Sequence, residues 1–420
     1  MDRNGSLGKC EVLVIGTGIV GVMSALYLQN EGKSVTFLER GEIARGASAG
    51  NAGILAFPEI IPMPAPGIMK KAPKWLIDPL GPLSVPPAYA IKIAPWLWRF
   101  WKASSQRIFE HGMRVQTRMM ALAASEMQQV AAMPELSSFI SNTGTLDLYD
   151  TSASFDASNH HWEEKAKAGF TFSRIGRTEI DELQPGLAPQ FKHAVYTPAG
   201  LQVSDPHEFT KAIAELVIAR GASFRKGEAV RIEAVGESTI VTLANGDKID
   251  ADKVILAAGA WSKPLAASLG NDVPLETERG YNTTLPVGSF DLKRQIYFND
   301  HAFVVTPLSS GVRVGGAVEL GGLDLPPNFR RSEAMLKKAS RFLPGLKTEG
   351  GQQWMGFRPS LPDSLPVIGP SRNARSVIYA FGHGHLGLTQ SAATARLVTE
   401  LVCERDTSIP VDPFRANRFS

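Results

Sequence analysis

The sequence predicts an α/β protein in which a discontinuous, mainly parallel-sheet domain is joined to a second domain of mainly antiparallel strands and helices. Three segments carry this prediction. Residues 12–15 form a short apolar run that leads through a glycine turn into a helix over 19–30. Residues 254–261 are predicted as a buried strand ending in small residues, and residues 378–381 as a strand that precedes a glycine-rich loop and a helix over 390–403. Because these segments lie far apart, the parallel-sheet domain must be assembled from separate stretches of chain.

The first segment has a glycine pattern typical of dinucleotide binding. Gly16, Gly18 and Gly21 are spaced for a tight turn, a close approach of backbone to a pyrophosphate, and close packing of a helix on a strand. The helix that follows points its N-terminal N–H groups at the phosphates. A second β-like run at 34–38 ends at Glu39, whose carboxylate can accept hydrogen bonds from both ribose hydroxyls of an adenosine. We therefore predict a Rossmann-like nucleotide site. The alternative is a loop whose glycines serve packing alone.

A loop of small residues, GASAGNAG at 46–53, follows the acidic strand end. Small side chains let the backbone lie against a flat ligand, and Ser48 and Asn51 add polar groups. A plain flexible loop is the alternative, but the position directly after Glu39 favours a ligand contact.

Composition excludes several classes of function. The chain has 420 residues, 44% of them hydrophobic, which is enough for two or three structural units. The formal net charge is +3, and no basic block interleaved with aromatic residues indicates a nucleic-acid partner. Cys10 and Cys403 show no metal-ligand spacing and fit a reducing compartment. The chain enters its first strand almost at once, so we expect no signal peptide, and no run reaches the ~18 apolar residues of a membrane span.

Residues 58–101 differ in character from the rest of the chain, because prolines interrupt them every few residues. This segment holds four of the seven tryptophans, Trp75, Trp96, Trp98 and Trp101. They are interleaved with the basic residues Lys70, Lys71, Lys74, Lys92 and Arg99, and Lys102 follows directly. Aromatic rings beside lysines suit a membrane interface. Two interpretations stay open, a peripheral membrane contact and an insertion packed on the main body. We expect no regular core element here.

The remaining elements follow from periodicity and capping signals. Ser204-Asp205-Pro206 predicts the start of a helix, and Asn245-Gly246 predicts a hairpin turn. We predict helices over 114–133, 155–168, 206–220 and 332–341, and strands over 145–149, 230–235, 240–243, 277–285 and 302–318. The nucleotide domain is assigned to 1–57, 201–272 and 351–420, and the second domain to 58–200 and 273–350.

The C-terminal region holds two further candidate features. Arg358 lies in a proline-fixed turn within GFRPSLPDSLPVIG at 356–369, and a fixed guanidinium is a bidentate partner for a carboxylate. An ordinary surface arginine is the alternative. The glycine loop at 382–387 precedes a helix N-terminus, which stabilises negative charge. His383 and His385 have no third ligand at suitable spacing, so we predict no metal and expect them to shape the pocket.

Together these motifs resemble the D-amino acid oxidase superfamily of FAD-dependent amine oxidoreductases, which includes glycine and sarcosine oxidases, and within it the bacterial D-amino acid dehydrogenases. The resemblance is carried by the glycines at 16, 18 and 21 with Glu39, by the loop at 46–53, and by LAAGAWS at 256–262, ETERGYN at 276–282, the segment 356–369 and FGHGHLGLTQ at 381–390. These motifs occur in family order and span nearly the whole chain. The insertion at 58–101 also resembles the dehydrogenases more than the oxidases.

The resemblance implies non-covalent FAD, because no cysteine stands where some sarcosine oxidases tether their flavin. The residues that it implies for the ADP half are Gly16, Thr17, Gly18, Ile19, Gly21, Glu39 and Arg40. Those along the flavin are Ser48, Asn51, Ala52, Gly53 and Ile54, with Val230 and Gly259 on the adenine side. Those at the isoalloxazine are Gly382, His383, Gly384, Leu386, Gly387 and Thr389. Arg358 matches the family's carboxylate-binding arginine. Tyr281 is expected on the substrate side, and His383 is grouped with these two as a catalytic candidate.

The activity implied is oxidative deamination of D-amino acids to 2-oxo acids and ammonia. Hydride passes from Cα to flavin N5, and orientation of the substrate supplies much of the rate. Electrons then leave to a quinone-type acceptor, from an enzyme in the cytoplasm or attached peripherally to the inner face of the cell membrane. The alternatives are a D-proline or hydroxy-D-proline dehydrogenase and an oxygen-using glycine or sarcosine-type oxidase. A flavin-bearing electron-transfer subunit with no substrate is a different class, and Arg358 argues against it.

Overall fold

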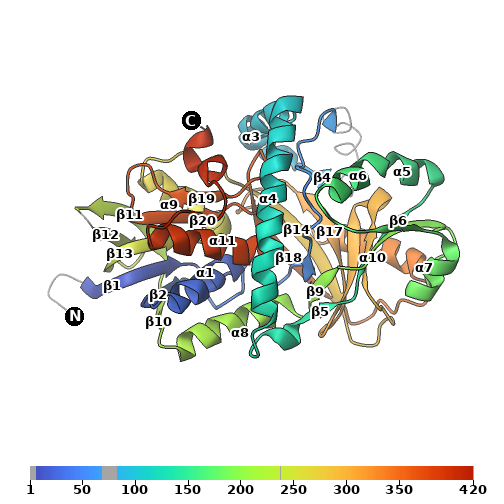
Figure 1. The fold of residues 1–420 in the computed structure, drawn as a ribbon, viewed down its shortest axis with the longest axis horizontal. Coiled ribbons are helices and arrows are strands. Elements are labelled where there is room, and N and C mark those ends of the chain that lie inside the picture. The colour runs from blue at the N-terminus through green and yellow to red at the C-terminus, as the bar shows by residue number, and fades with distance from the viewer. Residues whose placement is uncertain (1–5, 69–82, 237, 420) are drawn as a thin grey trace.

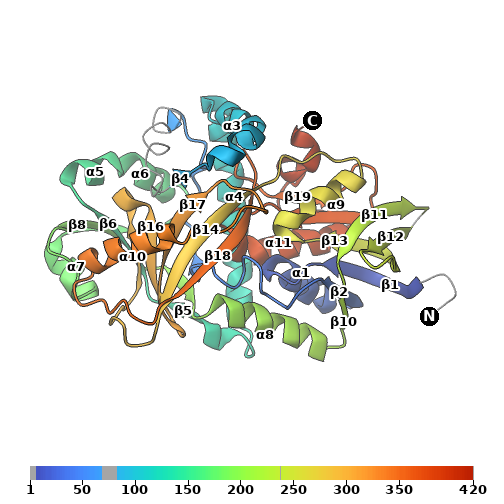
Figure 2. The same ribbon diagram turned by 180° about the vertical axis from the view of Figure 1, so that it is seen from behind.

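A computed structural model of the chain describes residues 6–68, 83–236 and 238–419. Two sheets lie side by side, and the long helix α4 (Gln106–Ala131) crosses the molecule between them (Figure 1). The view from behind shows the second sheet as a broad curved surface (Figure 2). The predicted residues Lys70, Lys71, Lys74 and Trp75 lie outside the described residues.

The first sheet is the mainly parallel α/β sheet that the sequence predicts: β10, β2, β1, β13 and β20 run parallel, and β11, β12 and β19 are added by antiparallel pairing. Among the described residues it has eight strands, ordered β10-β2-β1-β13-β12-β11, with β20 joining β13 and β19 joining β20. The strands are β1 (Ser6–Ile15), β2 (Val35–Glu39), β10 (Ser223–Lys226), β11 (Ala229–Val235), β12 (Ser238–Leu243), β13 (Lys248–Leu256), β19 (Val367–Pro370) and β20 (Val377–Phe381). Val12, Leu13 and Val14 are fully buried, as expected for a parallel strand covered on both faces.

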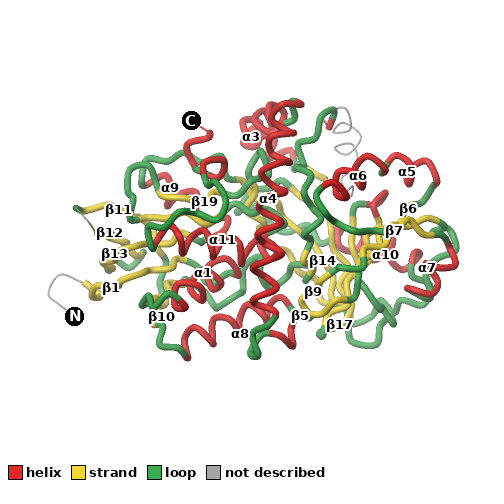
Figure 3. Tube along the Cα trace, viewed as in Figure 1, coloured by secondary structure: helices red, strands yellow, loops and turns green. Residues whose placement is uncertain are grey.

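Helices cover both faces of this sheet (Figure 3). Helices α1 (Ile19–Asn30), α4, α8 (Pro206–Ala219) and α11 (Gly387–Val402) share one core cluster, and α9 (Ser262–Ser268) packs on the other face. Asp205 caps α8 as the sequence predicts, because its Oδ1 accepts hydrogen bonds from the backbone N–H of His207 at 2.9 Å and of Glu208 at 3.1 Å.

The second sheet is mainly antiparallel. In the described part of the chain it has nine strands, ordered β18-β14-β17-β16-β15-β6-β8-β7, with β4 beside β17. These are β4 (Leu83–Ser84), β6 (Thr145–Tyr149), β7 (Ser173–Ile175), β8 (His193–Thr197), β14 (Glu276–Leu285), β15 (Gln295–Phe298), β16 (Phe303–Leu308), β17 (Gly311–Glu319) and β18 (Gln352–Ser360). Its outer face packs on α7 (Arg177–Leu183) and α10 (Arg330–Phe342), and its inner face is turned toward the first sheet.

A small sheet and short helices complete the described structure. Strands β3 (Ile54–Leu55), β9 (Leu201–Val203) and β5 (Ile140–Asn142) pair in that order, and α5 (Ser152–Ala157) and α6 (Asn159–Lys167) follow β6. Short 3₁₀ turns lie at Pro87–Tyr89, Ser137–Phe139, Gly259–Trp261, Asn299–His301, Asp412–Phe414 and Ala416–Phe419.

Two features differ from expectation. The insertion, in which the sequence predicted no regular core element, contains a regular helix, α3 (Ala90–Ala103), although Pro95 lies inside it. Its buried side is made by Ile93 and Trp96, which pack against Leu320. Strand β18 falls in the C-terminal segment assigned to the nucleotide domain, yet it pairs with β14 in the second sheet. None of the helices in the described ranges has the length and apolar character needed to cross a bilayer.

Candidate active site

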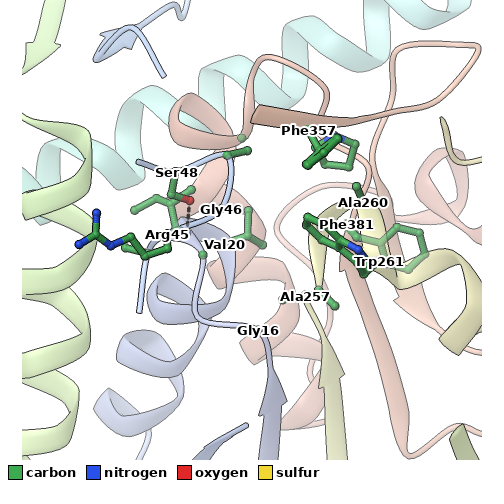
Figure 4. A pocket seen from close by; sticks show the side chains of 18 of the residues that line it. Gly16, Val20, Arg45, Gly46, Ser48, Ala257, Ala260, Trp261, Phe357 and Phe381 are labelled. Carbon is green, nitrogen blue, oxygen red and sulfur yellow. Dashed lines mark hydrogen bonds between the residues drawn. The ribbon is translucent and has the colours of Figure 1, made fainter. Parts of the chain in front are cut away.

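A cavity of about 390 Å³ lies where the parallel strands β1, β2, β13 and β20 end, and its opposite wall is formed by β18 of the second sheet. In open α/β sheets ligands bind at the carboxyl ends of the strands. Figure 4 shows Gly16 at the end of β1, the loop with Gly46 and Ser48 on one side, and Trp261 and Phe357 on the other.

The glycine turn admits no side chain. Gly16 has a φ of +101°, and a Cβ there would lie 2.6 Å from the carbonyl oxygen of Ala257. A Cβ on Gly21 would lie 2.0 Å from the carbonyl oxygen of Gly16. Strand, turn and helix therefore pack as closely as the glycine spacing predicts. Helix α1 begins at the cavity wall, and Ser48 Oγ accepts a hydrogen bond from Ile19 N at 2.9 Å.

Glu39 ends β2 inside the cavity wall. Its Oε2 accepts hydrogen bonds from Thr17 N and Thr17 Oγ1, both at 2.9 Å, and its Oε1 accepts one from Gly41 N at 2.9 Å. The carboxylate is thus held in one orientation, and its remaining lone pairs can serve ribose hydroxyls. The Arg40 guanidinium lies 3.8 Å from the centre of the Trp261 ring, which makes a flat wall nearby.

Polar contacts hold the loop at 46–53 in place, so it is not a plain flexible loop. Asn51 donates a hydrogen bond from Nδ2 to the carbonyl oxygen of Ser48 at 3.0 Å and accepts one at Oδ1 from Gly53 N at 2.9 Å. The second sheet reaches across to the same loop. Asn282 Nδ2 donates to the carbonyl oxygen of Gly50 at 2.7 Å, and Arg313 donates to that of Asn51 at 2.5 Å.

Trp354 connects this loop to β18. A Cβ on Gly50 would lie 2.2 Å from the indole of Trp354, and a Cβ on Gly356 would lie 1.9 Å from it. Two glycines therefore leave room for one large ring, which lies in the cavity wall. This tryptophan is not among the site residues predicted from the sequence. A signal was present in the sequence. Every second residue of a strand lies on the same face, so Trp354 and Gly356 share the face of Arg358.

Arg358 lines the cavity as the sequence predicts. Its guanidinium lies over Gly280, where a Cβ would come within 2.6 Å of Cζ. Glu278 is the residue directly opposite Arg358 in the β14–β18 pair. Burial lowers the pKa of Arg358 from its usual 12.5, and the charge of Glu278 opposes this shift. The side chain of Arg358 has no hydrogen-bond or ion-pair partner in the described parts of the chain. The guanidinium is therefore available to an anionic ligand.

The C-terminal glycine loop brings a second helix N-terminus to the cavity. Gly384 and Gly387 line the wall, and α11 begins at Gly387. His383 lies beside them, with its Nε2 hydrogen-bonded to Thr394 Oγ1 at 2.9 Å, and burial lowers its pKa from 6.5 to about 3. Burial also lowers the pKa of His385. Both imidazoles are thus neutral near pH 7. Within the described ranges no group of three or more His, Cys, Asp or Glu residues is arranged to hold a metal ion.

The structure brings most, but not all, of the predicted site residues to this cavity. Those in its wall are Gly16, Gly18, Ile19, Glu39, Arg40, Ser48, Asn51, Gly259, Arg358, His383, Gly384 and Gly387. Thr17 and Gly21 support the turn from behind, and Gly53 and Thr389 anchor the segment after the loop. Ala52, Ile54, Val230, Gly382 and Leu386 are not in the wall, and Val230 is 49% exposed on β11.

Tyr281 is not placed at the cavity. Its hydroxyl donates to Glu319 at 2.6 Å and accepts from Asn328 N at 3.0 Å, in a fully buried position. Side chains alternate along β14, so Tyr281 lies on the face away from Glu278 and Gly280. The structure therefore places Tyr281 in the packed interior of the second domain. Nothing in this position supports the predicted contact with the substrate.

The residues around the cavity are suited to bind a dinucleotide cofactor. A glycine turn without room for Cβ atoms, two helix N-termini and an oriented carboxylate supply the contacts that pyrophosphate and ribose require. A family model described as FAD dependent oxidoreductase matches residues 11–401. The chain belongs to this family, and its cofactor is FAD.

Curated relatives cover nearly the whole chain. A D-amino-acid oxidase of Bradyrhizobium diazoefficiens is 34% identical over 97% of this chain and 98% of the relative. A D-amino acid dehydrogenase of Neisseria meningitidis serogroup C is 29% identical over 97% of this chain and 99% of the relative. Among solved structures, glycine oxidase from Geobacillus kaustophilus superposes with a TM-score of 0.75 at 21% identity, over 98% of this chain and 99% of that one. This likeness confirms the predicted fold class.

Proposed function

We propose that this protein oxidises D-amino acids to 2-oxo acids and ammonia with FAD, and passes the electrons to a quinone-type acceptor. The observation that carries the proposal is Arg358, a partly buried cation in the wall of the flavin cavity with no hydrogen-bonding partner among the described side chains. The names of the relatives that align over almost the full chain, an oxidase and a dehydrogenase of D-amino acids, support the substrate class.

The chain's own residues bind and orient the substrate. Arg358 holds the carboxylate through two parallel hydrogen bonds, which fixes the direction of Cα. Glu278, directly opposite it in the β14–β18 pair, supplies a negative charge close to the guanidinium. When bound, FAD supplies the acceptor for the hydride that leaves Cα. The neutral His383 and His385 add no positive charge that would compete with Arg358 for the carboxylate.

Anaerobic mixing of the purified holoenzyme with matched D- and L-amino acids tests the activity. We expect D-alanine or D-proline to bleach the flavin absorbance and the L-enantiomers to leave it unchanged. Reduced enzyme is then mixed with a ubiquinone analogue or with oxygen, and we expect faster reoxidation by the quinone. Bleaching by sarcosine or glycine with rapid reoxidation by oxygen would instead support the oxidase alternative.

The quinone acceptor is supported by the exposed face of α3. Ile93 and Trp96 face the protein, whereas Ile91, Trp98 and Trp101 are 89%, 51% and 54% exposed. The same helix carries Lys92, Arg99 and Lys102, and Lys102 Nζ lies 3.6 Å from the centre of the Trp98 ring. Exposed rings with basic neighbours suit an anionic lipid surface, which is where a lipophilic quinone is found.

Liposome co-sedimentation tests this contact. We expect wild type to bind vesicles containing anionic lipid, and less so at high salt because each basic residue adds about 1 kcal/mol that salt screens. The variant Trp98→Ser/Trp101→Ser should bind weakly and keep its flavin, because both rings are exposed. Trp96→Ser is unsuitable, since its ring is buried against Leu320. Equal sedimentation of wild type and the double variant would contradict the membrane contact.

A further inference from the structure

The face of the second sheet that closes the flavin cavity carries a carboxylate next to Arg358. Glu278 on β14 is directly opposite Arg358 on β18, and residues opposite one another in an antiparallel pair share a face. The same face carries Asn282, which donates to the loop at 46–53, and Trp354, which lies in the cavity wall. Glu278 therefore points to the flavin side of the sheet.

Glu278 is buried without a partner. It is 4% exposed, and within the described ranges its carboxylate accepts no hydrogen bond and forms no ion pair. Glu276, on the same face of β14, shows the usual arrangement, because it accepts hydrogen bonds from the Tyr89 hydroxyl at 2.9 Å and from Thr277 N at 2.8 Å. A buried carboxylate without hydrogen bonds is costly. The position of Glu278 therefore indicates a ligand that supplies the missing donors.

The carboxylate of Glu278 is open on one side. Neither of its oxygens is fully enclosed by protein, although both lack a hydrogen-bond donor among the described residues. The charge of Glu278 opposes the fall in pKa that burial causes at Arg358 and at His385, so Glu278 lies near both of them. Arg358 and His385 line the flavin cavity. The open side of the carboxylate therefore adjoins the wall of that cavity.

The guanidinium of Arg358 does not neutralise Glu278 by direct contact. It lies over Gly280, further along β14, where a Cβ would come within 2.6 Å of Cζ. It forms no ion pair with Glu278 in the described structure, although the Cβ atoms of opposite residues are only about 5 Å apart. A cation and an anion are thus presented side by side. An α-amino acid carries a carboxylate and an ammonium on one carbon, so it is complementary to this pair.

We propose that Glu278 binds the ammonium group of the substrate while Arg358 binds its carboxylate. This inference rests on the proposed oxidation of D-amino acids and adds a second substrate-binding residue to it. The ammonium donates charge-assisted hydrogen bonds to the Glu278 carboxylate, which thereby gains the donors that it lacks. Holding two substituents of Cα restricts the direction of the Cα–H bond. A carboxylic acid without an amino group would meet Arg358 but be repelled by Glu278.

Two unreactive ligands of the same shape test the contact with the ammonium. 2-Aminoisobutyrate has no hydrogen on Cα and therefore cannot transfer a hydride, and pivalate has a methyl group in place of the ammonium. Each is titrated into the holoenzyme, and binding is followed by the change in flavin absorbance. Wild type should bind 2-aminoisobutyrate at least about tenfold more tightly than pivalate, as expected for a charge-assisted hydrogen bond. Equal affinities, or no binding of 2-aminoisobutyrate, would overturn the proposal.

Three variants assign the effect to Glu278. Glu278→Gln keeps the shape of the side chain, and it should weaken 2-aminoisobutyrate about tenfold and leave pivalate bound at least as tightly, because the like charge is gone. Glu278→Asp keeps the charge and should recover part of the loss, which a role in packing alone would not produce. The control Glu276→Gln removes a charge from the same face of β14, where Tyr89 already occupies the carboxylate, and should change neither affinity by more than about twofold. An equal effect of Glu276→Gln and Glu278→Gln would contradict a direct contact.

Turnover separates this inference from the proposed activity. In anaerobic reduction of the flavin by D-alanine, Glu278→Gln should raise the apparent Kd about tenfold. If no D-amino acid reduces the flavin but 2-aminoisobutyrate binds in the expected pattern, the proposed activity fails while the ammonium contact stands. If D-alanine reduces the flavin with the same apparent Kd in wild type and in Glu278→Gln, the activity stands and the role given to Glu278 is wrong.

Discussion

Replacing Asp147 with asparagine should stabilise the protein at neutral and alkaline pH. Burial raises the pKa of Asp147 from its ordinary 3.8 to about 6, a difference of about 2 pH units. At about 1.4 kcal/mol per unit, ionisation costs the folded state about 3 kcal/mol above pH 6. Asparagine carries no charge, and it can still accept the hydrogen bond from Asn299. The gain from Asp147→Asn is therefore expected to approach 3 kcal/mol.

The dependence on pH has a definite sign. Because the pKa is higher in the folded than in the unfolded protein, the folded state binds more protons between pH 4 and 6, and the penalty appears as pH rises through this window. Urea unfolding of wild type and Asp147→Asn, followed by tryptophan fluorescence at pH 8 and at pH 4.5, measures it. The advantage of the variant should be largest at pH 8 and shrink as the pH falls. A variant less stable than wild type at pH 8 would refute the reasoning, since it would mean that Lys165 compensates the charge fully.

Three further outcomes follow from the cavity. Gly21→Ala should lose most of its FAD and about 1–3 kcal/mol of its free energy of unfolding, because the new Cβ would lie 2.0 Å from the Gly16 carbonyl oxygen. The flavin content per protein and a thermal melt measure the two effects. Glu39→Gln should weaken FAD binding by about 1–2 kcal/mol, measured by titrating apoprotein with FAD, and unchanged affinity would contradict the ribose assignment. Because the His383 pKa is about 3, the pH profile of flavin reduction should have the same apparent pKa values in His383→Asn as in wild type, and the loss of one ionisation would contradict a neutral His383.

The sequence predicted best where local chemistry determines the structure. The glycine turn with Glu39 and the cap at Asp205 depend on a few neighbouring residues, so their patterns were sufficient. The direction in which the Tyr281 side chain points was harder to predict. The ETERGYN motif places Tyr281 near Glu278 and Gly280 in sequence, but side chains alternate along a strand, so Tyr281 lies on the opposite face of β14.

Long-range pairing was not available from the sequence. Strand β18 joins β14 although residues 286–351 of the chain separate the two strands, and that pairing is what sets Glu278 opposite Arg358. Helix α3 was missed because Pro95 usually interrupts a helix, whereas here packing of Ile93 and Trp96 on Leu320 supports it. The pairing of Asp147 with Tyr297 is equally long-range, since the two residues meet only through the β6–β15 register.

The most direct test of the proposed function is anaerobic reduction of the flavin by D-alanine in wild type and in Arg358→Met. Methionine has a similar length and no charge, so the substrate carboxylate would lose its partner in a partly buried site. We expect Arg358→Met to keep its FAD and its absorbance spectrum, and to lose about 2–5 kcal/mol of transition-state binding in the kcat/KM for flavin reduction. Arg358→Lys should recover part of this loss, because lysine offers a charge without the fork. Reduction of Arg358→Met at the wild-type rate would contradict the carboxylate assignment and the function built on it.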